Sequence, residues 1–140
     1  MRYWDASALV PLIVAEESSE RLRALARDGD IVTWCLSSVE ISSAIERRAR
    51  EGAVAGADRR TALELLAEIA GVWTEVTAVA PVRERACRLL AVHSLRAADA
   101  VQLAAALVAA GDRPAGHEFV CADGRLADAA GREGYRLTLS

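Results

Sequence analysis

Four acidic residues stand at positions from which their carboxylates can act together. Each of them ends a predicted strand or lies near the start of a predicted helix, and they are Asp5, Glu40, Asp99 and Asp123. Asp99 interrupts the apolar segment 97–110, which reads as a helix buried on nearly every face. A buried carboxylate is costly unless it is paired or binds a metal ion, and neighbouring acids repel one another. The pattern therefore predicts an acidic pocket for a divalent ion, and oxygen ligands alone favour Mg²⁺ or Mn²⁺.

Three of these acids also have a purely structural interpretation. Asp5 is well placed to cap the helix that follows it, and Asp123 can be a turn residue. Residues 37–40 read Ser-Ser-Val-Glu and match the capping-box pattern, which is the favoured interpretation of Glu40 when it is taken alone. The metal-binding interpretation is therefore carried by the combination of the acids.

Asp99 is the hardest of the four to explain by a structural role. The dipole of a helix stabilises an acid in the first turn by at most about 1 kcal/mol, which does not offset several kcal/mol of desolvation. An ion pair with Arg96 is the remaining structural interpretation.

The acids must be positioned by alternating strands and helices. Segments rich in β-branched and aromatic residues predict strands at 2–5, 31–35, 74–79, 118–121 and 135–139. Apolar periodicity predicts helices at 7–14, 18–27, 37–50, 57–70, 81–93, 97–110 and 124–132. This alternation predicts one α/β domain over residues 1–140, with a mostly parallel sheet of about five strands covered by helices on both faces.

Composition excludes several classes of protein. All 17 basic residues are arginine, and both P-loop chemistry and receiver-domain phosphorylation rely on a lysine. Two histidines and three widely spaced cysteines do not form a zinc pattern, and the thiols are expected to be free in a reducing cytoplasm. The longest apolar run, 103–110, is too short for a membrane span, and the acid at position 5 argues against an export signal.

Four segments together resemble the PIN-domain ribonucleases of the VapC toxin type. They are 3–10 (YWDASALV), 37–41 (SSVEI), 95–104 (LRAADAVQLA) and 119–126 (FVCADGRL), and the third is the most specific. They cover nearly the whole chain in the expected order. One departure is Cys121, where such proteins often carry Thr or Ser two residues before the last acid. A thiol is a poor ligand for Mg²⁺, so it is in question whether the side chain at position 121 helps to hold the metal site.

The resemblance implies a three-layer α/β/α fold, a metal-dependent endoribonuclease, a small antitoxin of the VapB type as partner, and a homodimer. In this hypothesis Asp5 and Asp99 bind Mg²⁺ or Mn²⁺, and Glu40 and Asp123 complete the pocket. The metal would activate a water for attack on the RNA phosphodiester.

Two further side chains of these segments are candidates for a supporting role. Ser7 either contacts the phosphate or orients Asp5, and Arg96 either stabilises developing negative charge or pairs with an acid.

Two alternatives stay open at this point. The first is a PIN-fold module that binds RNA or protein with little catalysis. The second concerns helices 37–50 and 57–70, whose arginines form either a solvated basic face or the rim of an apolar groove for an antitoxin segment; they are Arg47, Arg48, Arg50, Arg59 and Arg60.

Overall fold

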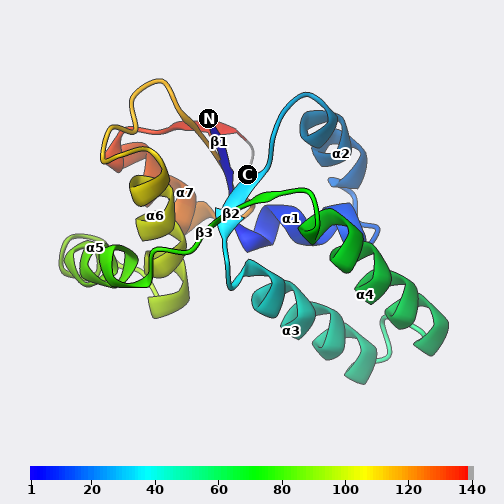
Figure 1. Ribbon diagram of the computed structural model, residues 1–140. Coiled ribbons are helices and arrows are strands. Elements are labelled where there is room, and N and C mark those ends of the chain that lie inside the picture. Colours follow the sequence, from blue (N-terminus) through cyan, green and yellow to red (C-terminus); the bar gives the residue numbers. More distant parts are fainter. Residues whose placement is uncertain (139–140) are drawn as a thin grey trace.

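The computed structural model describes residues 1–138, in which five parallel strands lie between two layers of helices (Figure 1). The strands are β1 (Arg2–Trp4), β2 (Val32–Trp34), β3 (Thr74–Val76), β4 (Glu118–Val120) and β5 (Arg136–Thr138). This arrangement confirms the predicted three-layer α/β/α fold. Leu139, the predicted end of the last strand, lies outside the described residues.

Seven helices connect these strands within residues 1–138. They are α1 (Ala6–Ile13), α2 (Ser19–Arg27), α3 (Ser37–Arg50), α4 (Gly56–Ala70), α5 (Val79–Val92), α6 (Ala97–Ala109) and α7 (Gly124–Glu133). The largest difference from the prediction is at β3, which ends at Val76 because α5 begins two residues before Pro81. Proline is tolerated there because the first turn of a helix needs no partner for its N–H groups.

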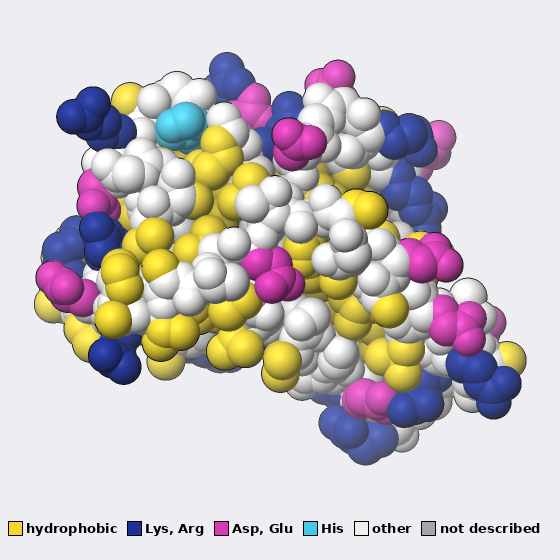
Figure 2. All heavy atoms as spheres, in the orientation of Figure 1, with side chains coloured by type: hydrophobic (Ala, Val, Ile, Leu, Met, Phe, Trp, Pro, Cys, Tyr) yellow, Lys and Arg dark blue, Asp and Glu magenta, His cyan; other side chains and the backbone are white. Residues whose placement is uncertain are grey.

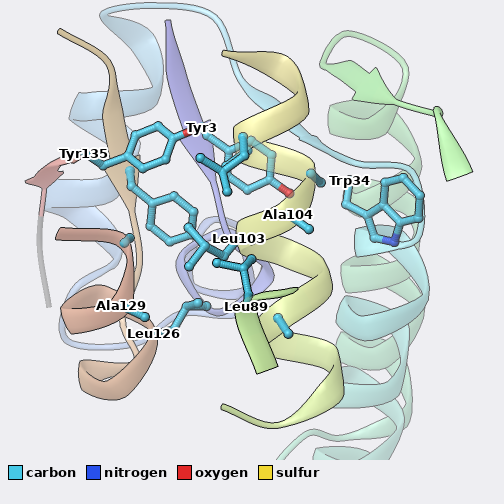
Figure 3. Packing of buried hydrophobic residues seen from close by; sticks show 14 of the residues in the cluster. Tyr3, Trp34, Leu89, Leu103, Ala104, Leu126, Ala129 and Tyr135 are labelled. Carbon is cyan, nitrogen blue, oxygen red and sulfur yellow. The ribbon is translucent and has the colours of Figure 1, made fainter. Parts of the chain in front are cut away.

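Alternating side chains of β1 divide the core into two parts. Successive residues of a strand point to opposite faces of the sheet, so Tyr3 and Trp4, both fully buried, belong to different clusters. Tyr3 packs with Phe119 and with α5, α6 and α7, whereas Trp4 packs with α1, α2, α3 and α4. Figure 3 shows the Tyr3 ring beside α6, near Leu103 and Ala104. All three tryptophans, Trp4, Trp34 and Trp73, are buried in the core.

The order of the strands decides where a ligand can bind. The sheet has the order β3-β2-β1-β4-β5, so the chain moves from β1 to one side and later returns to its other side at β4. Open parallel sheets bind ligands beyond the carboxyl ends of the strands at such a reversal. Asp5 directly follows β1, Asp123 lies shortly after β4, and the neighbouring β2 leads into α3 with Glu40.

Candidate active site

A pocket of about 1200 Å³ opens beyond the carboxyl ends of the strands. Glu40, Asp99 and Asp123 line it, and Asp5 lies buried immediately before its lining residues Ala6 and Ser7. The structure therefore brings the four predicted acids to one place, and we call them the acidic cluster. Arg96 also lines the pocket.

Asp5 both caps a helix and belongs to the acidic cluster. Its side chain is 4% exposed and accepts hydrogen bonds from the backbone N–H of Ser7, at 2.9 Å, and from the Ser7 hydroxyl. Burial raises the pKa of Asp5, the bonds from Ser7 lower it, and the negative charge of Asp99 raises it further. The two interpretations of Asp5 are thus compatible, and of the two contacts expected for Ser7 the structure shows the one with Asp5.

The capping-box interpretation of Glu40 is wrong. Helix α3 begins at Ser37 itself, so the capping position falls on Leu36, which forms no side-chain cap. The Ser37 hydroxyl turns into the protein and lies 2.7 Å from Thr33 Oγ1. Glu40 Oε1 instead accepts a hydrogen bond of 2.9 Å from Gln102 Nε2, a contact that requires the tertiary fold.

The pKa of Glu40 reflects its place beside other acids. Burial raises this pKa, the hydrogen bond from Gln102 lowers it, and the charges of Asp5 and Asp99 raise it. Glu40 is therefore a carboxyl whose ionised form is held against electrostatic repulsion by a single amide donor. Such a group is a better proton acceptor than an ordinary exposed glutamate.

Asp99 is less buried than the sequence pattern predicts. Residues Ala100 to Leu107 of α6 are largely buried, but the first turn projects beyond the sheet, where Ala97 and Ala98 are exposed and Asp99 is half-buried. Burial and the charge of Asp123 raise the pKa of Asp99, and the charge of Arg96 lowers it. Among the described residues Arg96 forms no ion pair with Asp99, so the structural interpretation of Asp99 as one half of a salt bridge is wrong.

Asp123 and Cys121 occupy the end of the pocket near β4. Asp123 is exposed and caps α7 by accepting a hydrogen bond of 2.9 Å from the Leu126 N–H. Cys121 is buried, with its Sγ 3.2 Å from the Asp123 N–H and 3.8 Å from Asp5 Oδ2. Burial and the charge of Asp5 raise the pKa of this thiol to about 12. A thiol is a poor ligand for Mg²⁺, and Cys121 Sγ donates to Asp5 Oδ2 in this structure.

The acidic cluster has the chemistry of a magnesium site without a complete coordination sphere. None of the ion pairs between described residues involves its four members. Within residues 1–138, no group of three or more acidic, histidine or cysteine side chains is close enough to hold a metal ion alone. Mg²⁺, however, usually keeps several waters and takes one or two carboxylates together with substrate phosphates. The pair Asp5 and Asp99 fits that requirement.

Metal-free protein should lose stability as the pH rises. The pKa values of Asp5, Glu40 and Asp99 are raised in the folded state, whereas the unfolded chain has ordinary values near 4. At pH values between the ordinary and the raised pKa values, the folded protein holds more protons than the unfolded chain does. The free energy of unfolding therefore falls as the pH rises. We expect the melting temperature in chelator to fall from pH 5 towards pH 8, and Mg²⁺ to stabilise the protein most at pH 8.

This experiment has an internal control. Asp112, Glu118 and Glu133 have lowered pKa values, and the stability that their ionisation provides is lost only at lower pH. Melting curves measured from pH 5 upward therefore leave out the contribution of these three carboxylates. A melting temperature that rises over this range in chelator would contradict the expected repulsion.

Sequence comparison matches the chain to a known protein family. The family model of the PIN domain matches residues 2–131. The chain belongs to the PIN domain family. PIN domains are generally nucleases, so family membership indicates nuclease activity. Among curated proteins, none is similar enough in sequence to count as a relative. No helix within residues 1–138 is long and apolar enough to cross a membrane.

Gln102 is a functional candidate to which the sequence motifs assign no role. Gln102 lies one turn after Asp99 and is the amide that contacts Glu40. A single amide in an otherwise apolar helix is the signal, because a buried amide needs partners for both its donor and its acceptor. The sequence does not contain the identity of those partners.

Proposed function

We propose that this PIN domain is a metal-dependent endoribonuclease of the VapC toxin type, which hydrolyses RNA phosphodiester bonds. The observation that carries the proposal is the acidic cluster itself. Four carboxylates from four separate segments gather at one pocket of a PIN domain, without an ion pair among the described residues. The pKa values of three of them, Asp5, Glu40 and Asp99, are raised. A divalent cation would relieve this repulsion.

In this proposal Asp5 and Asp99 hold Mg²⁺, for which Mn²⁺ can substitute. The bound ion lowers the pKa of water and offsets charge on the scissile phosphate. Ser7 keeps the Asp5 carboxylate oriented through its two hydrogen bonds. Glu40 is fixed through Oε1, and its Oε2 accepts a proton from the attacking water. Arg96, exposed at the start of α6, stabilises the negative charge that develops on the phosphate.

Arginines along the pocket supply contacts for the RNA backbone. The net charge of −3 gives no general attraction for nucleic acid, so phosphate binding must be local. Arg47, Arg96 and Arg125 all line the pocket and are exposed, whereas Arg48 is paired with Glu16. One guanidinium group can bind a phosphate through two parallel N–H···O hydrogen bonds. The placement of these arginines directs an RNA strand across the acidic cluster.

The test is cleavage of RNA by the purified protein. Wild-type protein is incubated with total RNA in Mg²⁺, in Mn²⁺ and in excess chelator, and the new RNA ends are sequenced to locate the cleaved sites. We expect defined ends that appear with either metal and disappear with chelator. RNA that is retained by the protein but stays intact in both metals would favour the alternative of a binding module.

A substitution of Glu40 distinguishes a catalytic role of this residue from a structural one. The Glu40→Gln variant keeps an acceptor oxygen for Gln102 Nε2 but loses the negative charge. We expect turnover to fall at least about tenfold, equivalent to about 1.4 kcal/mol of activation barrier, with a nearly unchanged melting temperature. Initial rates across a magnesium titration measure the effect, and wild-type turnover in this variant would remove Glu40 from the mechanism.

We also propose that a VapB-type antitoxin covers this pocket, in a hollow beside α3 and not in the groove expected between α3 and α4. Helices α3 and α4 pack directly on each other, and Arg59 of α4 forms an ion pair with Glu46 of α3 at 2.6 Å. The hollow lies instead on the other side of α3, where apolar Val10 and Val39 line the pocket with Arg47. Hydrogen exchange with and without the protein encoded next to this chain should show protection of α3, and unchanged α3 would contradict this placement.

The homodimer remains a proposal. Hydrophobic side chains gather over α5 on the face shown in Figure 2. Val79 and Leu90 are 56% and 43% exposed, and their spacing places them on the same side of α5. A second copy of the chain would cover this patch. Sedimentation equilibrium of wild type and of the Leu90→Glu variant tests this, because loss of the dimer is expected in the variant alone.

A further inference from the structure

Gln102 joins three of the elements that carry the acidic cluster. It lies in α6, one turn after Asp99, and its side chain is completely buried. Tyr3 Oη of β1 donates a hydrogen bond of 2.7 Å to Gln102 Oε1. Gln102 Nε2 donates to Glu40 Oε1 at 2.9 Å and to Ser37 Oγ at 3.0 Å, both in α3. One amide thus connects α6 and α3 with β1, the strand that Asp5 directly follows.

The orientation of this amide is determined by its neighbours. An ionised carboxylate only accepts hydrogen bonds, so Glu40 requires the Nε2 side of Gln102. Oε1 then faces Tyr3 Oη, which can donate. Every donor and acceptor of the Gln102 amide has a partner, and Figure 3 shows Tyr3 held beside α6 by the surrounding core. Fully satisfied buried networks of this kind rigidify their surroundings.

The network continues into β2. Thr33 Oγ1 lies 2.7 Å from Ser37 Oγ and donates a hydrogen bond of 2.7 Å to the Trp4 carbonyl, the residue before Asp5. Thr33 and Ser37 are both fully buried. The chain of hydrogen bonds therefore runs from Glu40 through Gln102 and Ser37 back to the end of β1, and it fixes these elements relative to one another.

A position in the middle of an apolar helix does not need an amide for folding. Leu103, Ala104 and Leu107 show how the rest of α6 fills the core. At the same time, the Glu40 carboxylate is repelled by Asp5 and Asp99, and without a donor on its inner side it would turn towards solvent. The distinctive effect of Gln102 is therefore on Glu40 and not on the hydrophobic core.

We propose that Gln102 is a positioning residue that holds the Glu40 carboxylate in place beside Asp5 and Asp99 for catalysis. This inference rests on the proposed nuclease function. It predicts that removal of the amide lowers kcat through Glu40 and leaves metal binding at Asp5 and Asp99 nearly intact. Losses of about ten- to hundredfold are typical when a residue that orients an active group is removed.

The main test is a double-mutant cycle on the full chain. Gln102→Met preserves an unbranched side chain of similar length but removes both hydrogen-bonding groups. We expect kcat for RNA cleavage to fall about ten- to hundredfold, with KM and the Mg²⁺ affinity from calorimetry changed less than about threefold. In a Glu40→Gln background, Gln102→Met should add little further loss, because both substitutions disable one group. Fully additive losses would overturn the proposal.

A matched variant and crystal structures distinguish the positioning of Glu40 from a general contribution of Gln102 to the stability of the fold. Tyr3→Phe removes the other end of the network but leaves the bond between Gln102 and Glu40, so its effect on kcat should be much smaller. Crystal structures should show one Glu40 conformer in wild type and a displaced Glu40 in Gln102→Met. An undisplaced Glu40 would overturn the positioning role regardless of activity, whereas wild-type protein that cleaves no RNA would overturn the proposed function alone.

Discussion

Asp99→Asn is expected to abolish metal-dependent RNA cleavage while leaving the fold in place. Asparagine preserves the volume of the side chain, but it removes one of the two charges proposed to hold Mg²⁺. Loss of a residue that supports a metal ligand costs about ten- to hundredfold in activity, so loss of a ligand itself should cost at least about a hundredfold. Cleavage time courses over a range of Mg²⁺ concentrations measure this effect.

The same variant should be at least as stable as wild type in chelator. The charge of Asp99 raises the pKa values of Asp5 and Glu40, and Asp123 acts on Asp99 in the same way. Removing this repulsion stabilises the metal-free protein. Asp128→Asn on the exposed side of α7 is the matched control, with wild-type activity expected. Near-wild-type cleavage by Asp99→Asn would refute the assignment of Asp99 as a ligand.

Asp5→Asn should reduce activity as severely as Asp99→Asn, again by at least about a hundredfold. The asparagine oxygen can still accept the hydrogen bond from the Ser7 N–H, since asparagine caps helices as well as aspartate does. The buried negative charge is lost, and with it the repulsion from Asp99. We therefore expect a melting temperature in chelator equal to or above that of wild type.

Asp5→Ala distinguishes the capping role from the proposed metal role. Alanine removes both the charge and the acceptor for the Ser7 N–H, and loss of a helix cap costs about 1 kcal/mol. Asp5→Ala should therefore be as inactive as Asp5→Asn but melt at a lower temperature. If Asp5 served only as a cap, Asp5→Asn would keep its activity, and the paired assay of both variants would show it.

Local sequence patterns predicted the elements of this fold with small errors at their ends. Apolar periodicity and strand-forming residues are properties of short segments, so α3 and α6 were predicted within one residue of their observed bounds. The alternation of strands and helices likewise predicted a parallel sheet with both faces covered, which the structure confirms. The shortened β3 is an error of the same local kind, because a proline near a helix start is compatible with more than one boundary.

The convergence of the four acids could be anticipated, but their contacts could not. Residue type and position relative to predicted strands were enough to select Asp5, Glu40, Asp99 and Asp123. The capping-box prediction for Glu40 failed because the pattern at 37–40 is also satisfied by a Ser37 hydroxyl that turns inward. Likewise, the apolar run around Asp99 did not reveal that the first turn of α6 projects into the pocket.

The sequence by itself determined which segments form helices and strands, which faces are apolar, and which acids lie near the ends of elements, because these depend on neighbours within a few residues. The tertiary structure alone decided the strand order β3-β2-β1-β4-β5, and with it the reversal beside β1 where the pocket opens. It also decided the partners of Gln102, which lie 99 positions away at Tyr3 and 62 positions away at Glu40. Hydrophobic burial depends on apolar area and not on direction, whereas a hydrogen bond requires a specific atom at a specific distance, and only the folded chain brings such distant atoms together.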